Sequence, residues 1–173
     1  SIGLGLKHKY NPDSTQFYTK VNSVDKINAL KTAVNGFIDQ VAQNSADSSI
    51  AVVSFATNKA NVSGGLLPAK TSVETLKAAV NGLHANGATR ADLGMQEAAR
   101  ILDSGTNSKK VVVMFTDDEP TRGNTFEDDV ANDAISAAKD MKDKGTEVFT
   151  VGVFDSDPDI KTYEYMNFVS SNY

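Results

Sequence analysis

Apolar residues recur at three- and four-residue spacing in several stretches of the chain, a pattern typical of helices with one buried face. The clearest stretch runs from about Val24 to Val41, behind Ser23, whose hydroxyl suits a helix N-cap. A second helix is predicted behind Thr71 and Glu74, which form a capping-box pattern. The same spacing predicts further helices over residues 93–104, 126–144 and 160–169.

Short apolar runs between these stretches predict strands. The strongest is Val111–Phe115, which is apolar without a break and therefore predicts a strand covered on both faces, as in a parallel sheet. Residues 50–55 and 148–153 have the same character. The run 61–67 contains Gly64 and Gly65, so we expect a bulged or edge strand there.

Strands and helices alternate along most of the chain. This order predicts one α/β domain over residues 1–173, a three-layer Rossmann-like fold with a mostly parallel central sheet and helices on both faces. The start of the chain departs from the pattern, because a strand should precede the helix at Val24–Val41. Residues 1–22 offer only Ile2, Leu4 and Leu6 separated by glycines, a poor candidate for the centre of a sheet.

Composition narrows the possible partners. Seventeen Lys and Arg against 22 Asp and Glu give a net charge of −5, which disfavours nucleic-acid binding through phosphates. The chain has no cysteine, so disulfides, thiolate metal sites and cysteine nucleophiles are excluded. No apolar run reaches the roughly 18–20 residues of a membrane span, and we expect no membrane insertion.

Two polar loops carry the candidate chemistry. One, Thr116–Gly123, follows the strongest predicted strand and contains the acids Asp117, Asp118 and Glu119. The other, Asn86–Asp92, leads into a predicted helix and contains Thr89 and Arg90. Ligands of such folds gather where the strands end, and carboxylate and hydroxyl oxygens suit Mg²⁺ or Mn²⁺. The alternatives are that the acids cap a helix or face solvent, and that Thr89 is an ordinary N-cap.

Motifs for catalysis are not recognisable. The chain has no Walker-type glycine loop, and Gly3-Leu4-Gly5 lacks the third glycine of a dinucleotide site. No serine lies in a nucleophile elbow, and His8 and His84 have polar or glycine-containing surroundings that suit surface positions. We therefore expect a protein that is not an enzyme.

Several of these segments together resemble a von Willebrand factor A domain. They are Gly87-Ala88-Thr89 before a helix, Val111–Phe115 running into the acidic loop, and Phe149–Val153 near the end. The resemblance extends from about Val24 onward, and the asparagine-rich turns are similar to those of surface and pilus-tip adhesins of Gram-positive bacteria.

The resemblance implies a metal-ion-dependent adhesion site. In this family an Asp-x-Ser-x-Ser motif after the first strand, a threonine and an aspartate hold Mg²⁺ or Mn²⁺, and Thr89 and Asp117 match the last two. Ser1 matches the final serine of the motif. Asp118 stands where the family usually has glycine, and it would form the rim of the ligand site with Glu119 and Arg90.

The first strand of the family, and most of its motif, are missing. That strand normally lies between those predicted at 50–55 and 111–115, so its absence would leave two strand edges unpaired inside the sheet. We expect the domain to be part of a longer protein. The strand could come from upstream sequence, a cleaved piece or another chain.

The function implied is adhesion on the cell wall or at a pilus tip. A carboxylate of a host extracellular-matrix or receptor protein would complete the shell of the bound cation. Two alternatives remain open. One is a Mg²⁺-dependent α/β enzyme that acts on a phosphate substrate, and the other is a structural domain of the same fold whose metal site has decayed.

Overall fold

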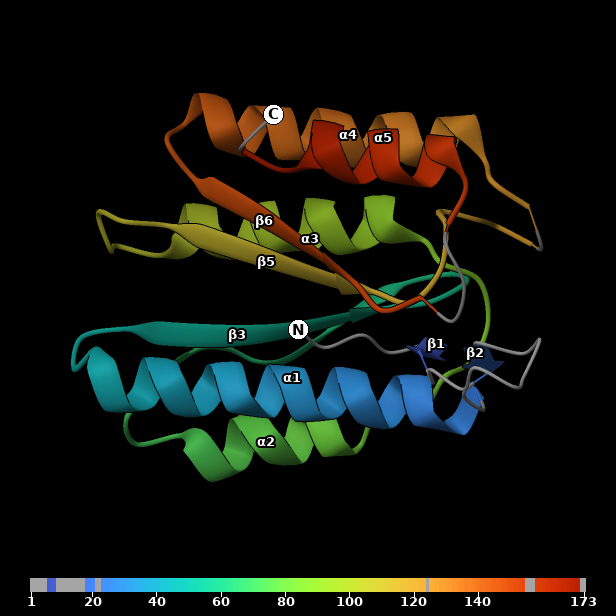
Figure 1. Ribbon diagram of the computed structural model, residues 1–173. Coiled ribbons are helices and arrows are strands. Elements are labelled where there is room, and N and C mark those ends of the chain that lie inside the picture. Colours follow the sequence, from blue (N-terminus) through green and yellow to red (C-terminus); the bar gives the residue numbers. More distant parts are fainter. Residues whose placement is uncertain (1–5, 9–17, 21–22, 124, 155–157, 172–173) are drawn as a thin grey trace.

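The computed structural model describes residues 6–8, 18–20, 23–123, 125–154 and 158–171, with side chains from Lys26 onward. Its helices and strands alternate as the apolar pattern predicts (Figure 1). The helices are α1 (Ser23–Asn44), α2 (Val73–Asn81), α3 (Ala91–Ser104), α4 (Asp128–Asp143) and α5 (Ile160–Val169). The strands are β1 (Leu6–His8), β2 (Tyr18–Lys20), β3 (Ser49–Phe55), β4 (Ala60–Pro68), β5 (Val111–Thr116) and β6 (Glu147–Gly152).

The described strands pair in three separate two-stranded ladders. β3 pairs with β4 antiparallel and β5 with β6 parallel. β1 and β2 form an antiparallel hairpin of their own, so residues 6–8 do not enter the central sheet. The expected mostly parallel sheet is therefore observed as one parallel and one antiparallel pair, because no ladder joins β3 to β5 in the described part of the chain.

The edge strand with two glycines is confirmed. Among the described strands β4 pairs only with β3, and its register shifts between the partners of Ile50 and Val52. Gly64 and Gly65 have φ values of +78° and +69°, a region that other residues rarely adopt, so the bulge depends on these glycines.

Helix ends differ from the sequence prediction in two places. α2 has Ser72 as its N-cap without a side-chain hydrogen bond, so the expected capping box of Thr71 and Glu74 is not formed. Its C-cap is Gly82, which leaves Leu83 outside the helix. α4 begins at Asp128 rather than Phe126, and it ends before Gly145, whose φ of +86° suits a helix terminus.

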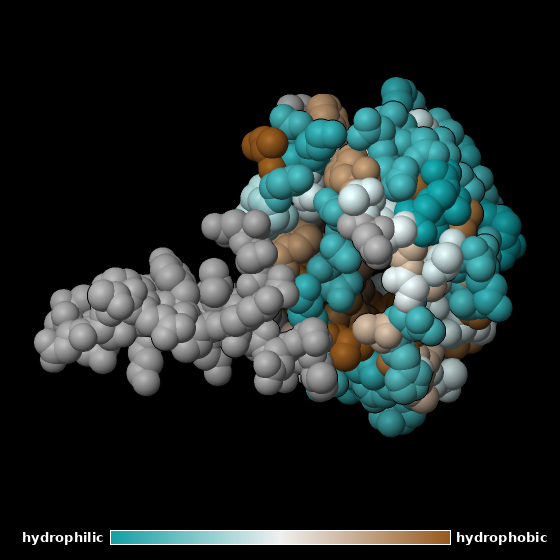
Figure 2. Space-filling model, turned by 90° about the vertical axis from the view of Figure 1, so that its right-hand side faces the viewer, coloured by the Kyte–Doolittle hydropathy of each residue, from teal (hydrophilic) through white to brown (hydrophobic). Residues whose placement is uncertain are grey.

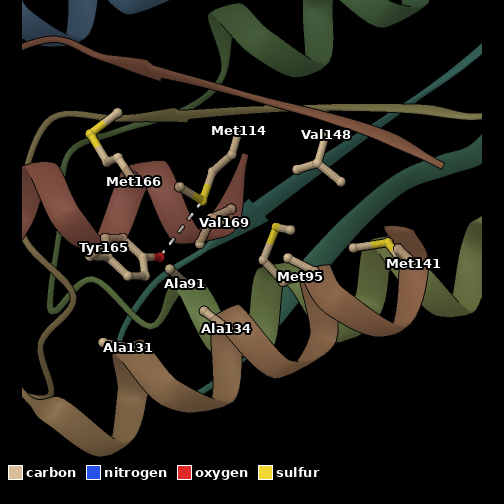
Figure 3. Packing of buried hydrophobic residues seen from close by; sticks show 11 residues of the cluster. Ala91, Met95, Met114, Ala131, Ala134, Met141, Val148, Tyr165, Met166 and Val169 are labelled. Carbon is tan, nitrogen blue, oxygen red and sulfur yellow. Dashed lines mark hydrogen bonds between the residues drawn. The ribbon is translucent and has the colours of Figure 1, made fainter. Parts of the chain in front are cut away.

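Buried residues form two hydrophobic clusters rather than one. The larger lies among α3, α4, α5, β5 and β6 and includes the contact between the Tyr165 hydroxyl and the Met114 sulfur (Figure 3). Burial raises the pKa of Tyr165 far above its ordinary value, and the charge of Asp92 adds to this. The smaller cluster consists of Ile38, Leu76 and Val80, between α1 and α2, with β3 and β4 packed against it.

Coverage of the strands is less complete than their apolar sequences predict. β3 is half-buried along its whole length, and Val111 of β5 is 40% exposed although Met114 is buried. Among the described residues, β3 pairs with β4 and β5 pairs with β6, and no ladder between β3 and β5 adds to their coverage. Among the aromatic residues of α5, Tyr165 is buried, while Tyr163 and Phe168 are nearly half exposed.

Residues 11–15 and the apolar positions Ile2 and Leu4 lie outside the described residues. Among the described helices, none is long and apolar enough to span a membrane.

Candidate functional site

The two loops singled out by the sequence are bonded to each other. The backbone N–H of Thr121 donates to the carbonyl of Thr89 at 3.1 Å, and the N–H of Thr89 donates to the hydroxyl of Thr121 at 3.3 Å. Thr121 is buried, and its hydroxyl in turn donates to the carbonyl of Gly123. Together these bonds fix the loop before α3 beside the loop that follows β5.

A third loop, the turn between β3 and β4, is hydrogen-bonded to the loop that contains Thr89. The N–H of Ala88 donates to the hydroxyl of Thr57 at 2.9 Å. Gly87 has a φ of +82°, and a Cβ at this position would overlap the Thr57 hydroxyl. The glycine is therefore required both by its backbone conformation and by the close approach of Thr57. All three loops lie at the ends of strands β3 and β5, the edge of an α/β sheet where ligands bind.

Thr89 and Asp117 lie in the two bonded loops. Both residues are half-buried, and neither side chain makes a hydrogen bond or ion pair with the described part of the chain. The N-cap of α3 is Arg90, whose side chain makes no capping hydrogen bond, so the Thr89 hydroxyl is not the N-cap group of this helix. Ser1, the third predicted ligand, lies outside the described residues.

The two acids that follow Asp117 differ in environment. Asp118 is exposed, and its carboxylate accepts from the N–H of Glu119 at 2.9 Å while its carbonyl accepts from the Thr116 hydroxyl at 2.8 Å. Glu119 is half-buried, and this burial, together with the negative charges of Asp118 and Asp159, raises the pKa of its carboxyl. The loop thus gathers negative charge. None of its acids provides the side-chain cap of α4, whose N-cap is Glu127.

The resemblance places Arg90 on the ligand rim, and the structure shows that Arg90 is paired with Asp92. Its guanidinium forms a bidentate ion pair with the carboxylate of Asp92, with N–O distances of 2.8 and 2.6 Å. The hydrogen bond to Asp92 raises the pKa of Arg90 above its ordinary value. Asp92 is only 1% exposed, and sequence reasoning missed it. The sequence feature that could have indicated this ion pair is an acid two residues after an arginine, at the start of a predicted helix.

The donor chemistry of the rim fits a hard cation. Thr89 and Asp117 offer a hydroxyl and a carboxylate, ligands that Mg²⁺ and Mn²⁺ accept. Arg90 directly follows Thr89 in the sequence, and its positive charge is neutralised by Asp92. Within the described residues, no group of three or more His, Asp or Glu side chains is arranged to hold a metal. The candidate donors at this edge are the hydroxyl of Thr89 and the carboxylate of Asp117.

Fold and site together define an α/β domain whose loops meet at the C-terminal edge of its strands. Residues 21–172 match the von Willebrand factor type A domain family, and the chain belongs to that family. No curated protein sequence matches the chain.

Two solved structures similar to this chain are of one protein, the pilus adhesin SpaC from Lactobacillus rhamnosus GG. One has a TM-score of 0.71 at 15% identity and covers 85% of this chain. The other, an open conformation, has a TM-score of 0.68 at 16% identity and covers 86% of this chain. The matched region is 25% of the SpaC chain in both, so this chain spans about a quarter of that protein's length. At this identity the likeness establishes the fold.

Proposed function

We propose that this protein is an adhesion module that binds a carboxylate of its partner through a divalent cation, Mg²⁺ or Mn²⁺. The observation that carries the proposal is the bonded pair of loops, which brings Thr89 and Asp117 to one edge of the fold with side chains that no described group engages. Membership of the von Willebrand factor type A family and the likeness to a pilus adhesin support adhesion over catalysis.

The proposed residues have separate roles. Asp117 supplies negative charge to the cation and Thr89 supplies a neutral oxygen, while Ser1 is the third protein ligand of the proposal. A bound cation attracts the carboxylate of a partner strongly, because the ion is the largest local charge at the site. Asp118 and Glu119 at the rim disfavour acidic partners until a cation is present, which makes binding depend on the cation.

The partner proposed is a protein of the host extracellular matrix or a host receptor. The corresponding location is the outside of a Gram-positive cell, on the cell wall or at a pilus tip. The structural similarity to a pilus adhesin supports this location. No part of the proposal involves insertion into a membrane or binding to a nucleic acid.

Calorimetric titration with Mn²⁺ and Mg²⁺ tests the cation site. We expect Asp117→Asn and Thr89→Val to weaken Mn²⁺ binding by at least about tenfold, and Thr89→Ser to retain binding. Asp140→Asn, an exposed acid on α4, is the matched control and should bind as the original chain does. Unchanged Mn²⁺ affinity in Asp117→Asn would mean that the proposed site is wrong. If the unsubstituted chain bound neither Mn²⁺ nor Mg²⁺, the alternative of a decayed metal site would be favoured.

Adhesion and catalysis are then separated by two assays. Binding to a surface coated with extracellular-matrix proteins should require Mg²⁺ or Mn²⁺ and be abolished by EDTA and by Asp117→Asn. Hydrolysis of ATP or of a phosphate monoester should stay at the uncatalysed rate. Turnover that depends on Asp117 would replace adhesion by the Mg²⁺-dependent enzyme alternative.

A further inference from the structure

The chain contains three Asn-Gly sequences, which are Asn35-Gly36, Asn81-Gly82 and Asn86-Gly87. Asparagine is thermolabile because the carbon of its side-chain amide can react with the backbone nitrogen of the next residue. Glycine in the next position hinders this reaction least, since it has no Cβ. The three sites therefore share the same local chemistry, and the fold decides which of them reacts.

Two of the three sites are held by helices. Asn35-Gly36 lies inside α1, and Asn81-Gly82 lies at the end of α2. The N–H of Gly82 donates to the carbonyl of Ala78 at 3.0 Å. The two asparagine side chains are also bonded to each other, because the amide nitrogen of Asn35 donates to the amide oxygen of Asn81 at 2.9 Å. Such a bonded site has to open locally before it can react.

The third site has neither form of protection. Asn86 and Gly87 are both exposed in the loop between α2 and α3. In the described part of the chain, neither the side chain of Asn86 nor the N–H of Gly87 has a hydrogen-bond partner. The loop lies at the right-hand side in Figure 1, and Figure 2 shows that hydrophilic residues cover much of that side. Water can therefore reach both reacting groups.

The fold also keeps a glycine after Asn86. A Cβ at position 87 would overlap the Thr57 hydroxyl, and the φ of Gly87 is +82°. A bulkier residue would slow the reaction, but it would destabilise the loop at this position. The contact with Thr57 thus maintains the reactive sequence in the folded protein.

We propose that Asn86 is a site of spontaneous deamidation, which converts it to aspartate or isoaspartate in the folded protein. The nitrogen of Gly87 gives up its proton to solvent and bonds to Cγ of Asn86. The Cγ–Nδ2 bond breaks, and the leaving nitrogen takes a proton from solvent and departs as ammonia. Water then opens the resulting succinimide ring, at Cγ to give aspartate or at the main-chain carbonyl carbon to give isoaspartate. The net reaction consumes one water and releases one ammonia, without oxidation or reduction.

Both products place a carboxylate on the loop that contains Thr89. Each conversion adds one negative charge to a chain whose net charge is −5. Aspartate leaves the backbone as it is. Isoaspartate lengthens the main chain by one atom before Gly87, so the 2.9 Å bond from the N–H of Ala88 to the Thr57 hydroxyl has to shift. The modification therefore changes both the charge and the anchoring of this loop.

The effect of the new charge on cation binding rests on the proposed function. Asn86 precedes Thr89 by three residues, so their Cα atoms lie at most about 11 Å apart. An added carboxylate at this range attracts a divalent cation. We expect Asn86→Asp to strengthen Mn²⁺ binding about twofold at physiological salt and more at low salt. Equal Mn²⁺ affinity of Asn86→Asp and the unsubstituted chain would overturn this effect on the cation.

Peptide mapping by mass spectrometry tests the modification itself, after incubation of the folded chain at neutral pH without any cation. We expect a gain of about 1 Da at Asn86, the difference between the water gained and the ammonia lost. Fragment spectra assign the gain to single residues, and it should arise at least about tenfold faster at Asn86 than at Asn35 or Asn81. Asn86→Gln is the matched control and should show no gain at position 86 on the same time scale.

Incubation in concentrated urea is the second control. Without helices the three sites should react at similar rates, because their local chemistry is the same. The proposal is overturned if Asn86 reacts no faster than Asn35 and Asn81 in the folded chain. It is also overturned if the preference for Asn86 persists unchanged in urea, because the cause would then be the neighbouring sequence and not the fold. Failure of the cation site alone would leave these mass measurements unaffected.

Discussion

The backbone N–H of Thr121 donates to the carbonyl of Thr89 at 3.1 Å, and this bond joins loops that lie 32 residues apart in the sequence. The side chain of Thr121 strengthens the link by accepting from the N–H of Thr89. The position of the Thr89 hydroxyl, and with it the candidate cation site, therefore depends on a residue that is not itself a proposed ligand.

Removal of the Thr121 hydroxyl should loosen this link. In Thr121→Val the N–H of Thr89 and the carbonyl of Gly123 both lose their partner, so we expect a loss of about 1–3 kcal/mol in the free energy of unfolding. Mn²⁺ affinity should fall as well. Urea denaturation and calorimetry measure the two effects. Thr121→Ser keeps the hydroxyl and is the control, and an equal loss in both variants would contradict the role assigned to this group.

Gly87 should not tolerate a side chain. Gly87→Ala forces a Cβ into the space of the Thr57 hydroxyl at a φ of +82°, and we expect it to cost about 1–3 kcal/mol. Gly123→Ala is the matched control, since no heavy atom lies within 4 Å of its Cβ and it should change stability by no more than about 0.5 kcal/mol. Thermal unfolding of the two variants side by side gives the comparison. Equal stability would mean that the Thr57 contact does not constrain the loop.

The ion pair of Arg90 and Asp92 should matter more than the ion pairs at the surface. Arg90→Met leaves the carboxylate of Asp92 buried without its partner, which we expect to cost about 3–5 kcal/mol. Arg100→Met is the control, because the side chain of Arg100 is 68% exposed and its pair with Glu97 should contribute at most about 1 kcal/mol.

A double substitution separates the pair from its parts. Arg90→Met with Asp92→Leu removes both charges and should be less destabilised than Arg90→Met alone, since no unpaired carboxylate remains buried. If the double variant were instead the less stable of the two, the unpaired carboxylate of Asp92 would not be the cause of the loss in Arg90→Met.

The two hydrophobic clusters should respond separately to substitution in the 173-residue chain. Leu76→Ala removes a fully buried side chain from the smaller cluster and should cost about 2–5 kcal/mol. Because the clusters share no buried residue, amide exchange should quicken in α2 and β3 but not in β5 and β6. Faster exchange of equal size in all four elements would mean that the clusters already form one cooperative unit.

Much of the fold follows from the local pattern of apolar residues. The helix at Val24–Val41 and the strand at Val111–Phe115 were predictable because a buried helix face repeats every three or four residues and a buried strand is continuously apolar. The bulged edge strand was predictable from Gly64 and Gly65, since glycine adopts positive φ without strain. Helix ends were less predictable, as the capping box of Thr71 and Glu74 illustrates.

Prediction of the site was limited because the sequence does not show which residues from distant segments lie close together in the folded domain. The chemical types of Thr89 and Asp117, and their positions after predicted elements, were readable. The buried carboxylate of Asp92 was not, because an acid in the first turn of a helix is ordinarily exposed, and only the folded domain shows that this one is buried and paired with Arg90.

The sequence by itself determined the order of helices and strands, the acidic character of the loop after β5 and the membership of an α/β class, because these depend on residues close together in the chain. Only the tertiary structure decided that Thr121 joins the two loops, that Thr57 requires a glycine at position 87, and that β3 pairs with β4 rather than with β5 in the described part of the chain. These features depend on which segments pack together in space, and hydrogen-bond pairing between distant segments leaves no periodic trace in the sequence.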